Sequence, residues 1–130
     1  ARAPGGGASA VAVAVDHLAL AVSDQARSCR FYEDYLDFAA ESEPRSDGVL
    51  MLHDARGFAL ALGETTEPII VPEFLHFGLG LSSPDEVRAF GDRLAADGVE
   101  IVGKWDEADY VSVKFRDPDG YVLEVSWEPE

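Results

Sequence analysis

The chain has 130 residues and a formal net charge of -15 at pH 7. That length suits one compact domain, and the charge excludes a nucleic-acid backbone or an anionic membrane surface as a partner. No apolar run approaches the ~18 residues of a membrane span, and the single cysteine, Cys29, cannot form a disulfide within the chain, so we expect a cytoplasmic protein.

The first part of the chain predicts one strand, one helix and three further strands over residues 13–63. A stretch rich in glycine and alanine precedes them, and we expect residues 1–12 to form a flexible tail. Ser23 and Asp24 can cap the helix, and the turn at 54–57 separates the last two strands. In chain order the predicted elements are a strand over 15–22, a helix to Leu36, a weak strand over 38–43, and strands over 48–53 and 57–63.

The same order of elements returns in the second part of the chain, over residues 73–130. A linker with two prolines occupies residues 64–72. Ser83-Pro84-Asp85-Glu86 has the pattern of a capping box with proline at the first helical position, and Gly98 is expected to end that helix. The other predicted elements are strands over 73–81, 99–104, 110–115 and 121–127, the last two joined by the turn at 117–120.

Two histidines occupy matching positions in this internal repeat. Residues 15–22 align with residues 74–81, which places His17 opposite His76, and Glu124 lies inside the last apolar strand. Side chains alternate across a strand, so each of the three shares its face with small residues rather than with bulky ones. These small neighbours leave space of the kind that forms a ligand cavity; they are Ala19, Ala21, Ala59, Ala61, Gly78 and Gly80.

Two imidazoles and one carboxylate can bind Mn, Fe, Co, Ni or Zn and leave coordination positions for water or substrate. We therefore predict a divalent metal ion held by His17, His76 and Glu124, acting as a Lewis acid on a small substrate. His53 has no counterpart in the repeat and is interpreted as a loop or strand-end residue, and Trp105 is interpreted as a packing residue. No side chain is assigned as a catalytic acid or base. The predicted lining of the cavity is Ala19, Met51, Ala61, Gly78, Tyr110, Ser112 and Lys114.

Four segments resemble the vicinal oxygen chelate superfamily, which includes glyoxalase I, bleomycin-resistance proteins, fosfomycin-resistance transferases and extradiol dioxygenases. They are residues 16–22, 30–36, 76–79 and 115–125, the last containing Asp117-Pro118-Asp119-Gly120. The resemblance implies an α+β fold of two βαβββ modules, whose mixed sheet curls around a central cavity. It also implies the same metal ligands, His17, His76 and Glu124, and a homodimer in which the modules pair within a chain or between chains.

The chain lacks one residue that is characteristic of glyoxalase I and another that is characteristic of the fosfomycin-resistance group. Aligning the two turns places Ala61 opposite Glu124, where glyoxalase I enzymes have a fourth ligand, and Ala19 stands where the fosfomycin group has a hydroxyl. Two functions therefore stay open. One is a metal-dependent lyase, isomerase, transferase or dioxygenase acting on vicinal oxygens. The other is a metal-free protein of the bleomycin-resistance type that sequesters a drug or metabolite.

Overall fold

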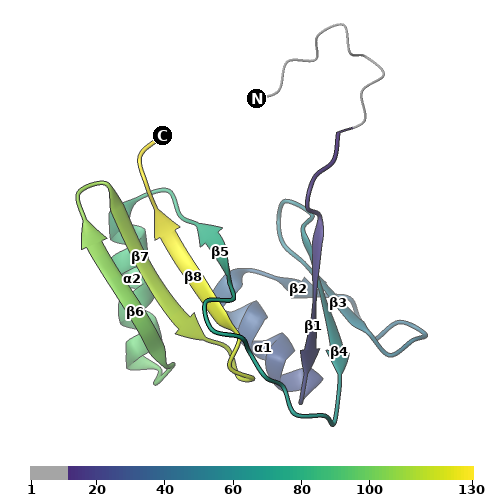
Figure 1. Cartoon of the computed structure of the whole chain (residues 1–130). Coiled ribbons are helices and arrows are strands. Elements are labelled where there is room, and N and C mark those ends of the chain that lie inside the picture. The colour runs from purple at the N-terminus through teal and green to yellow at the C-terminus, as the bar shows by residue number, and fades with distance from the viewer. Residues whose placement is uncertain (1–11) are drawn as a thin grey trace, which may run out of the picture.

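The computed structural model describes residues 12–130, so the predicted tail lies outside the described residues except for its last position. Two βαβββ modules follow one another along the chain, as the repeat predicts (Figure 1). The first contains β1 (His17–Val22), α1 (Gln25–Leu36), β2 (Ala39–Ala40), β3 (Leu50–His53) and β4 (Ala59–Glu64). The second contains β5 (His76–Gly80), α2 (Pro84–Ala96), β6 (Ile101–Glu107), β7 (Tyr110–Arg116) and β8 (Val122–Trp127).

Each module forms its own four-stranded mixed sheet, and the two sheets are separate (Figure 1). The strand orders are β1-β4-β3-β2 and β5-β8-β7-β6, so the first strand of each module pairs in parallel with its last strand. Ala19 pairs with Ala61 in the first sheet, and Gly78 pairs with Glu124 in the second. Ala61 therefore occupies the position in its module that Glu124 occupies in the other.

The apolar faces of the sheets and helices form the core. Helix α1 packs on β4, and α2 packs on β7 and β8. Gly91 of α2 lies against Val113, since a Cβ added at this glycine would come within 3.0 Å of the valine side chain. The opposite face of the second sheet, with Glu124 on β8 and Lys114 on β7, is left without a helix. The largest fully buried side chains are those of Tyr32, Leu52, Leu60, Leu62, Leu94, Phe115 and Leu123.

Both helices begin where the sequence predicts, although their caps differ in detail. The Asp24 side chain accepts the backbone N–H of Arg27 and caps α1, while the Ser23 hydroxyl turns away to Asp119 in the second module. Ser83 caps α2 by accepting the N–H of Glu86. The Glu86 carboxylate accepts the backbone N–H of Ser82 rather than that of Ser83.

Polar contacts join the two modules where β1 ends and β8 begins. Asp119, in the turn before β8, accepts the backbone N–H of Ser23 at 3.3 Å. The Tyr121 hydroxyl donates to the carbonyl of Ala21 on β1 at 2.7 Å. Because each module donates one of these two bonds to the other, the carboxyl end of β1 is held against the start of β8.

No helix in the described residues is both long and apolar enough to cross a membrane.

Three strand predictions were wrong by more than two residues at one end, and one of them is the strand predicted over 73–81, which forms only over His76–Gly80. The segment predicted as a strand over 38–43 pairs only at Ala39–Ala40. Conversely, β6 runs to Glu107, three residues past the predicted end, because it forms a tight hairpin with β7. Arg88 of α2 stabilises the added length by pairing with Asp106 at 2.8 Å.

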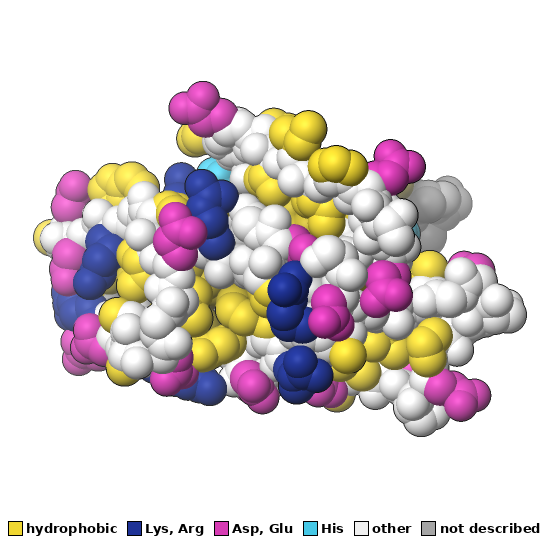
Figure 2. Space-filling model, turned by 90° about the horizontal axis from the view of Figure 1, so that it is seen from below, with side chains coloured by type: hydrophobic (Ala, Val, Ile, Leu, Met, Phe, Trp, Pro, Cys, Tyr) yellow, Lys and Arg dark blue, Asp and Glu magenta, His cyan; other side chains and the backbone are white. Residues whose placement is uncertain are grey.

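Acidic and basic side chains lie interspersed on the face shown in Figure 2, rather than in one continuous acidic patch.

Candidate metal centre

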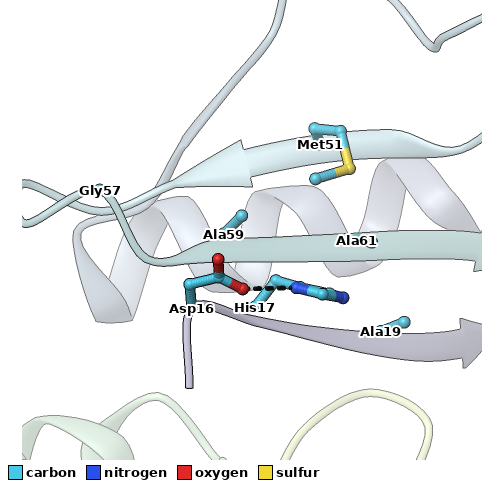
Figure 3. Close-up of a pocket in the computed structure, with 7 residues that line it drawn as sticks. All are labelled: Asp16, His17, Ala19, Met51, Gly57, Ala59 and Ala61. Carbon is cyan, nitrogen blue, oxygen red and sulfur yellow. Dashed lines mark hydrogen bonds and ion pairs between the residues drawn. The ribbon is translucent and has the colours of Figure 1, made fainter. Parts of the chain in front are cut away.

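His17 lies at the start of β1, in a cavity of about 460 Å³ on the first sheet (Figure 3). Its Nδ1 lies 2.7 Å from a carboxylate oxygen of Asp16, and because a carboxylate only accepts, Nδ1 carries the proton. The other ring nitrogen points away from Asp16 and is free for a ligand (Figure 3). The walls are small apart from one methionine; the remaining lining residues are Ala19, Met51, Gly57, Ala59 and Ala61.

His76 is oriented in the same way at the start of β5. Its Nδ1 donates to the backbone carbonyl of Phe74 at 2.8 Å, which directs Nε2 at Glu124. Phe74 has a φ of +69°, a left-handed conformation that non-glycine residues rarely adopt. Such strain costs about 1–3 kcal/mol and persists where the surroundings enforce it. Here the conformation directs the Phe74 carbonyl at the imidazole.

The carboxylate of Glu124 is held on both sides. One oxygen lies 3.3 Å from Nε2 of His76. The other accepts the hydroxyls of Tyr110 and Ser112, both on β7. Burial disfavours the charged form, but the bonds from Ser112 and Tyr110, together with Lys114 and His76, outweigh it and lower the pKa of Glu124. The side chain is therefore ready to bind a cation at neutral pH.

Lys114 and two aromatic rings complete this second half of the site. A cavity of about 220 Å³ is lined by Phe74, His76, Trp105, Tyr110, Lys114 and Glu124. The ammonium group of Lys114 lies 5.4 Å from the ring of Phe74 and 5.2 Å from that of Trp105. Trp105 is 41% exposed, so the sequence interpretation of this residue as packing was wrong, and its ring borders the cavity instead.

The structure thus brings the predicted residues together in two groups rather than one. His17, Ala19, Met51 and Ala61 line the first cavity, and His76, Tyr110, Lys114 and Glu124 line the second. Ser112 is fully buried beneath Glu124. Gly78 lies in a third cavity, of about 870 Å³ between β1 and β5, which His17 also lines. Over residues 12–130 of one chain, no three His, Cys, Asp or Glu side chains converge to hold a metal ion.

The donors in the second cavity fit a divalent ion. Two ligand bonds of about 2.1 Å at roughly a right angle place their donor atoms about 3 Å apart, close to the 3.3 Å between His76 and Glu124. Both imidazoles have their Nδ1 proton engaged by an acceptor, the arrangement that metal-binding histidines usually show. His53, by contrast, lies 3.1 Å from Glu41, away from both cavities.

Three residues with a role in these two cavities were not identified from the sequence. Asp16 could have been found, because a carboxylate directly precedes His17. The backbone contact of Phe74 could not have been found, because nothing in the sequence indicates that this phenylalanine adopts a left-handed conformation. Trp105 reaches the cavity because its ring lies over Gly103, where an added Cβ would come within 2.8 Å of the indole. That placement depends on β6 continuing past residue 104.

Comparison with protein families gives one match that covers most of the chain. Residues 14–125 match the model of the Glyoxalase/Bleomycin resistance protein/Dioxygenase superfamily. A comparison with curated proteins gives no significant match.

Solved structures of the same fold are numerous. A possible glyoxalase from Bacillus cereus is 26% identical, with a TM-score of 0.76 over 88% of this chain and 98% of that one. A glyoxylase/bleomycin resistance protein/dioxygenase domain from Frankia sp. EAN1pec is 23% identical, with a TM-score of 0.77 over 92% and 100%. A point mutant of the fosfomycin resistance protein FosX from Listeria monocytogenes, complexed with Mn(II) and 1S,2S-dihydroxypropylphosphonic acid, is 18% identical, with a TM-score of 0.74 over 88% and 90%.

Proposed function

The chain belongs to the Glyoxalase/Bleomycin resistance protein/Dioxygenase superfamily, and on that premise we propose that it is a metal-dependent enzyme acting on a small substrate with vicinal oxygens. His17, His76 and Glu124 are the proposed ligands. One observation carries the proposal: each histidine has its Nδ1 proton bound by an acceptor, Asp16 for one and the Phe74 carbonyl for the other. This leaves both Nε2 atoms available as ligands.

A divalent ion held by these residues would act as a Lewis acid on two neighbouring oxygens of the substrate. The protein residues supply position and charge. Ser112 and Tyr110 hold one oxygen of Glu124, so that the other stays directed at His76. Tyr110 also lines the cavity.

The proposed site is completed by a second copy of the chain. The cavity of His17 and the cavity of His76 and Glu124 share no residue, and 66% of the His17 side chain is exposed. Large apolar side chains in the segments that precede His17 and His76 are also exposed, which is typical of a surface that another protein covers. They are Val13, Val15, Ile70, Phe74 and Leu75, with exposed fractions from 54% to 93%. In this arrangement His17 of one copy faces His76 and Glu124 of the other.

Mixing two inactive variants tests the ligands and their arrangement together. We expect His17→Ala and His76→Ala each to lose the metal when purified alone. If the site lies between copies, refolding the two variants together restores one intact site in each mixed dimer. If all three ligands came from one chain, no mixture would restore binding. The readout is bound metal per chain by mass spectrometry, with Mn(II) supplied first because the FosX mutant structure contains that ion.

His53→Ala is the matched control, because this imidazole hydrogen-bonds only Glu41 among the described residues and should keep full metal content. A wild-type protein that takes up none of Mn, Fe, Co, Ni or Zn would overturn the proposal. The cavity of about 870 Å³ between β1 and β5 would then favour the metal-free binding protein, since its size suits a drug-like ligand.

A further inference from the structure

We propose that Lys114 recognises an oxyanion on the substrate, so that the preferred substrates combine two vicinal oxygens with a carboxylate, phosphonate or phosphate group. The inference rests on the proposed function for the position of the metal, but it concerns a different side chain and a different property. Lys114 is assigned a role in specificity, not in holding the metal.

The ammonium group of Lys114 has no anionic partner in the described part of the chain. Lys114 lies directly across from Glu124 in the pairing of β7 with β8, yet no carboxylate comes within 4 Å of its nitrogen in residues 12–130. Glu124 is already engaged, with one oxygen facing His76 and the other accepting Tyr110 and Ser112.

Two aromatic rings hold this cation at the cavity. The ammonium nitrogen lies 5.2 Å from the centre of the Trp105 ring and 5.4 Å from that of the Phe74 ring. Gly103, which pairs with Lys114 across β6 and β7, leaves room for the indole, because any Cβ there would come within 2.8 Å of it. The rings attract the ammonium group and limit its motion, so less conformational entropy is lost when a ligand binds.

The local charge favours an anion. The cavity is lined by one carboxylate, Glu124, and one ammonium group, Lys114. A divalent ion makes it positive, and it remains positive when His17 and its hydrogen-bonded Asp16 arrive from a second copy. A neutral diol would leave Lys114 unpaired in the closed site, whereas an oxyanion would form a charge-assisted hydrogen bond with it.

Three matched probes test the inference by isothermal titration of the Mn(II)-loaded protein. They are 1,2-propanediol, 2,3-dihydroxybutanoate and 1,2-dihydroxypropylphosphonate, which share a diol and differ in the attached group. We expect at least about 10-fold tighter binding of one or both anions than of propanediol, from the strength of hydrogen bonds to charged groups. The tighter of the two anions identifies the oxyanion. Equal binding of all three probes would overturn the inference.

Lys114→Met keeps an unbranched side chain between the rings and removes the charge. We expect it to abolish the preference for the anions in a protein that still binds Mn(II) and propanediol. Lys104→Met removes the neighbouring exposed lysine and should keep the preference. A preference that survives Lys114→Met would overturn the inference, even with the metal fully bound.

A second measurement tests the anion site in protein without bound metal. In a Trp127→Phe background, Trp105 is the single tryptophan, and its fluorescence reports on Lys114 in metal-free protein. If no metal binds, the proposed function fails, but a Trp105 signal with the phosphonate that Lys114→Met removes would still support the anion site. The absence of such a signal in both the metal-free and the Mn(II)-loaded protein would overturn it.

Discussion

The hydroxyl of Tyr32 donates a hydrogen bond of 2.8 Å to the carboxylate of Asp117, and both residues are buried. This bond joins α1 of the first module to the turn between β7 and β8 of the second. Burial, followed by the nearby Asp117 charge, raises the pKa of Tyr32, so the phenol stays protonated and always donates. The two modules are thus joined through a residue of the turn that the family resemblance singled out.

Removing this hydroxyl should weaken the fold. Tyr32→Phe leaves a buried carboxylate without one of its donors, and hydrogen bonds to charged groups contribute about 1.5–3 kcal/mol. We expect the free energy of unfolding in urea to fall by that amount. Tyr35→Phe is the control, since its bond to Asp97 is exposed, and surface changes usually stay within about 0.5 kcal/mol. Equal losses in the two variants would contradict a special role for the buried bond.

Asp117 should also make stability depend on pH. Burial raises its pKa, although the bond from Tyr32 and backbone N–H groups oppose the shift. A carboxyl group with a raised pKa in the folded state contributes stability that is fully present below its unfolded pKa, about 3.9. That stability is lost as pH rises through the folded value.

The variant Asp117→Asn does not titrate and isolates this effect. The free energy of unfolding of the wild type, measured relative to Asp117→Asn, should therefore be larger at about pH 4 than at pH 7. Urea denaturation at the two pH values measures the difference. A difference that is constant, or larger at pH 7, would show that Asp117 is not the group responsible.

Ser112 and Tyr110 should matter for metal affinity without being ligands. Ser112→Ala or Tyr110→Phe removes one of the two donors to the same oxygen of Glu124. Groups that orient a ligand in this way typically affect metal affinity by about 10–100-fold. We expect each variant to lose metal affinity within that range, measured by competition with a chelator. Ser126→Ala, two residues after Glu124 on the same face of β8, should leave the affinity unchanged. Unaltered affinity in all three variants would remove the positioning role.

The repeat makes a further prediction at Ala61. This residue occupies in the first sheet the position of Glu124 in the second, beside the cavity of His17. Ala61→Glu should therefore add a carboxylate next to His17 and tighten metal binding, measured by the same competition. Ala61→Gln, of similar size and without charge, is the control. If both variants bind metal equally, the new charge does not reach the ion.

The fold and the proximity of His76 to Glu124 could be predicted because both depend on strand alternation. His76 and Glu124 share a face in any register that pairs the apolar residues of β5 and β8, and the observed register is of that kind. The order of elements and the βαβββ modules were confirmed for the same reason. The proposed ligand role of His17, His76 and Glu124 stays a prediction, because one chain, over its described residues, does not bring the three together.

What the sequence could not predict depends on contacts between distant segments. The bond between Tyr32 and Asp117 spans 85 positions, and nothing local to either residue indicates it. The length of β6 was underestimated for a similar reason, since Asp106 looks like a loop residue until Arg88 of α2 pairs with it. The separation of the sheets likewise follows from how the modules pack rather than from the pattern of either one.

The bonds from Tyr121 to Ala21 and from Ser23 to Asp119 have a consequence for motion. They fasten the strand that carries His17 to the strand that carries Glu124, so within one chain these two side chains move as parts of a single body. In the proposed site between two copies, admission of a substrate would therefore depend on movement of one copy against the other, so conditions that loosen that contact should speed both entry and release.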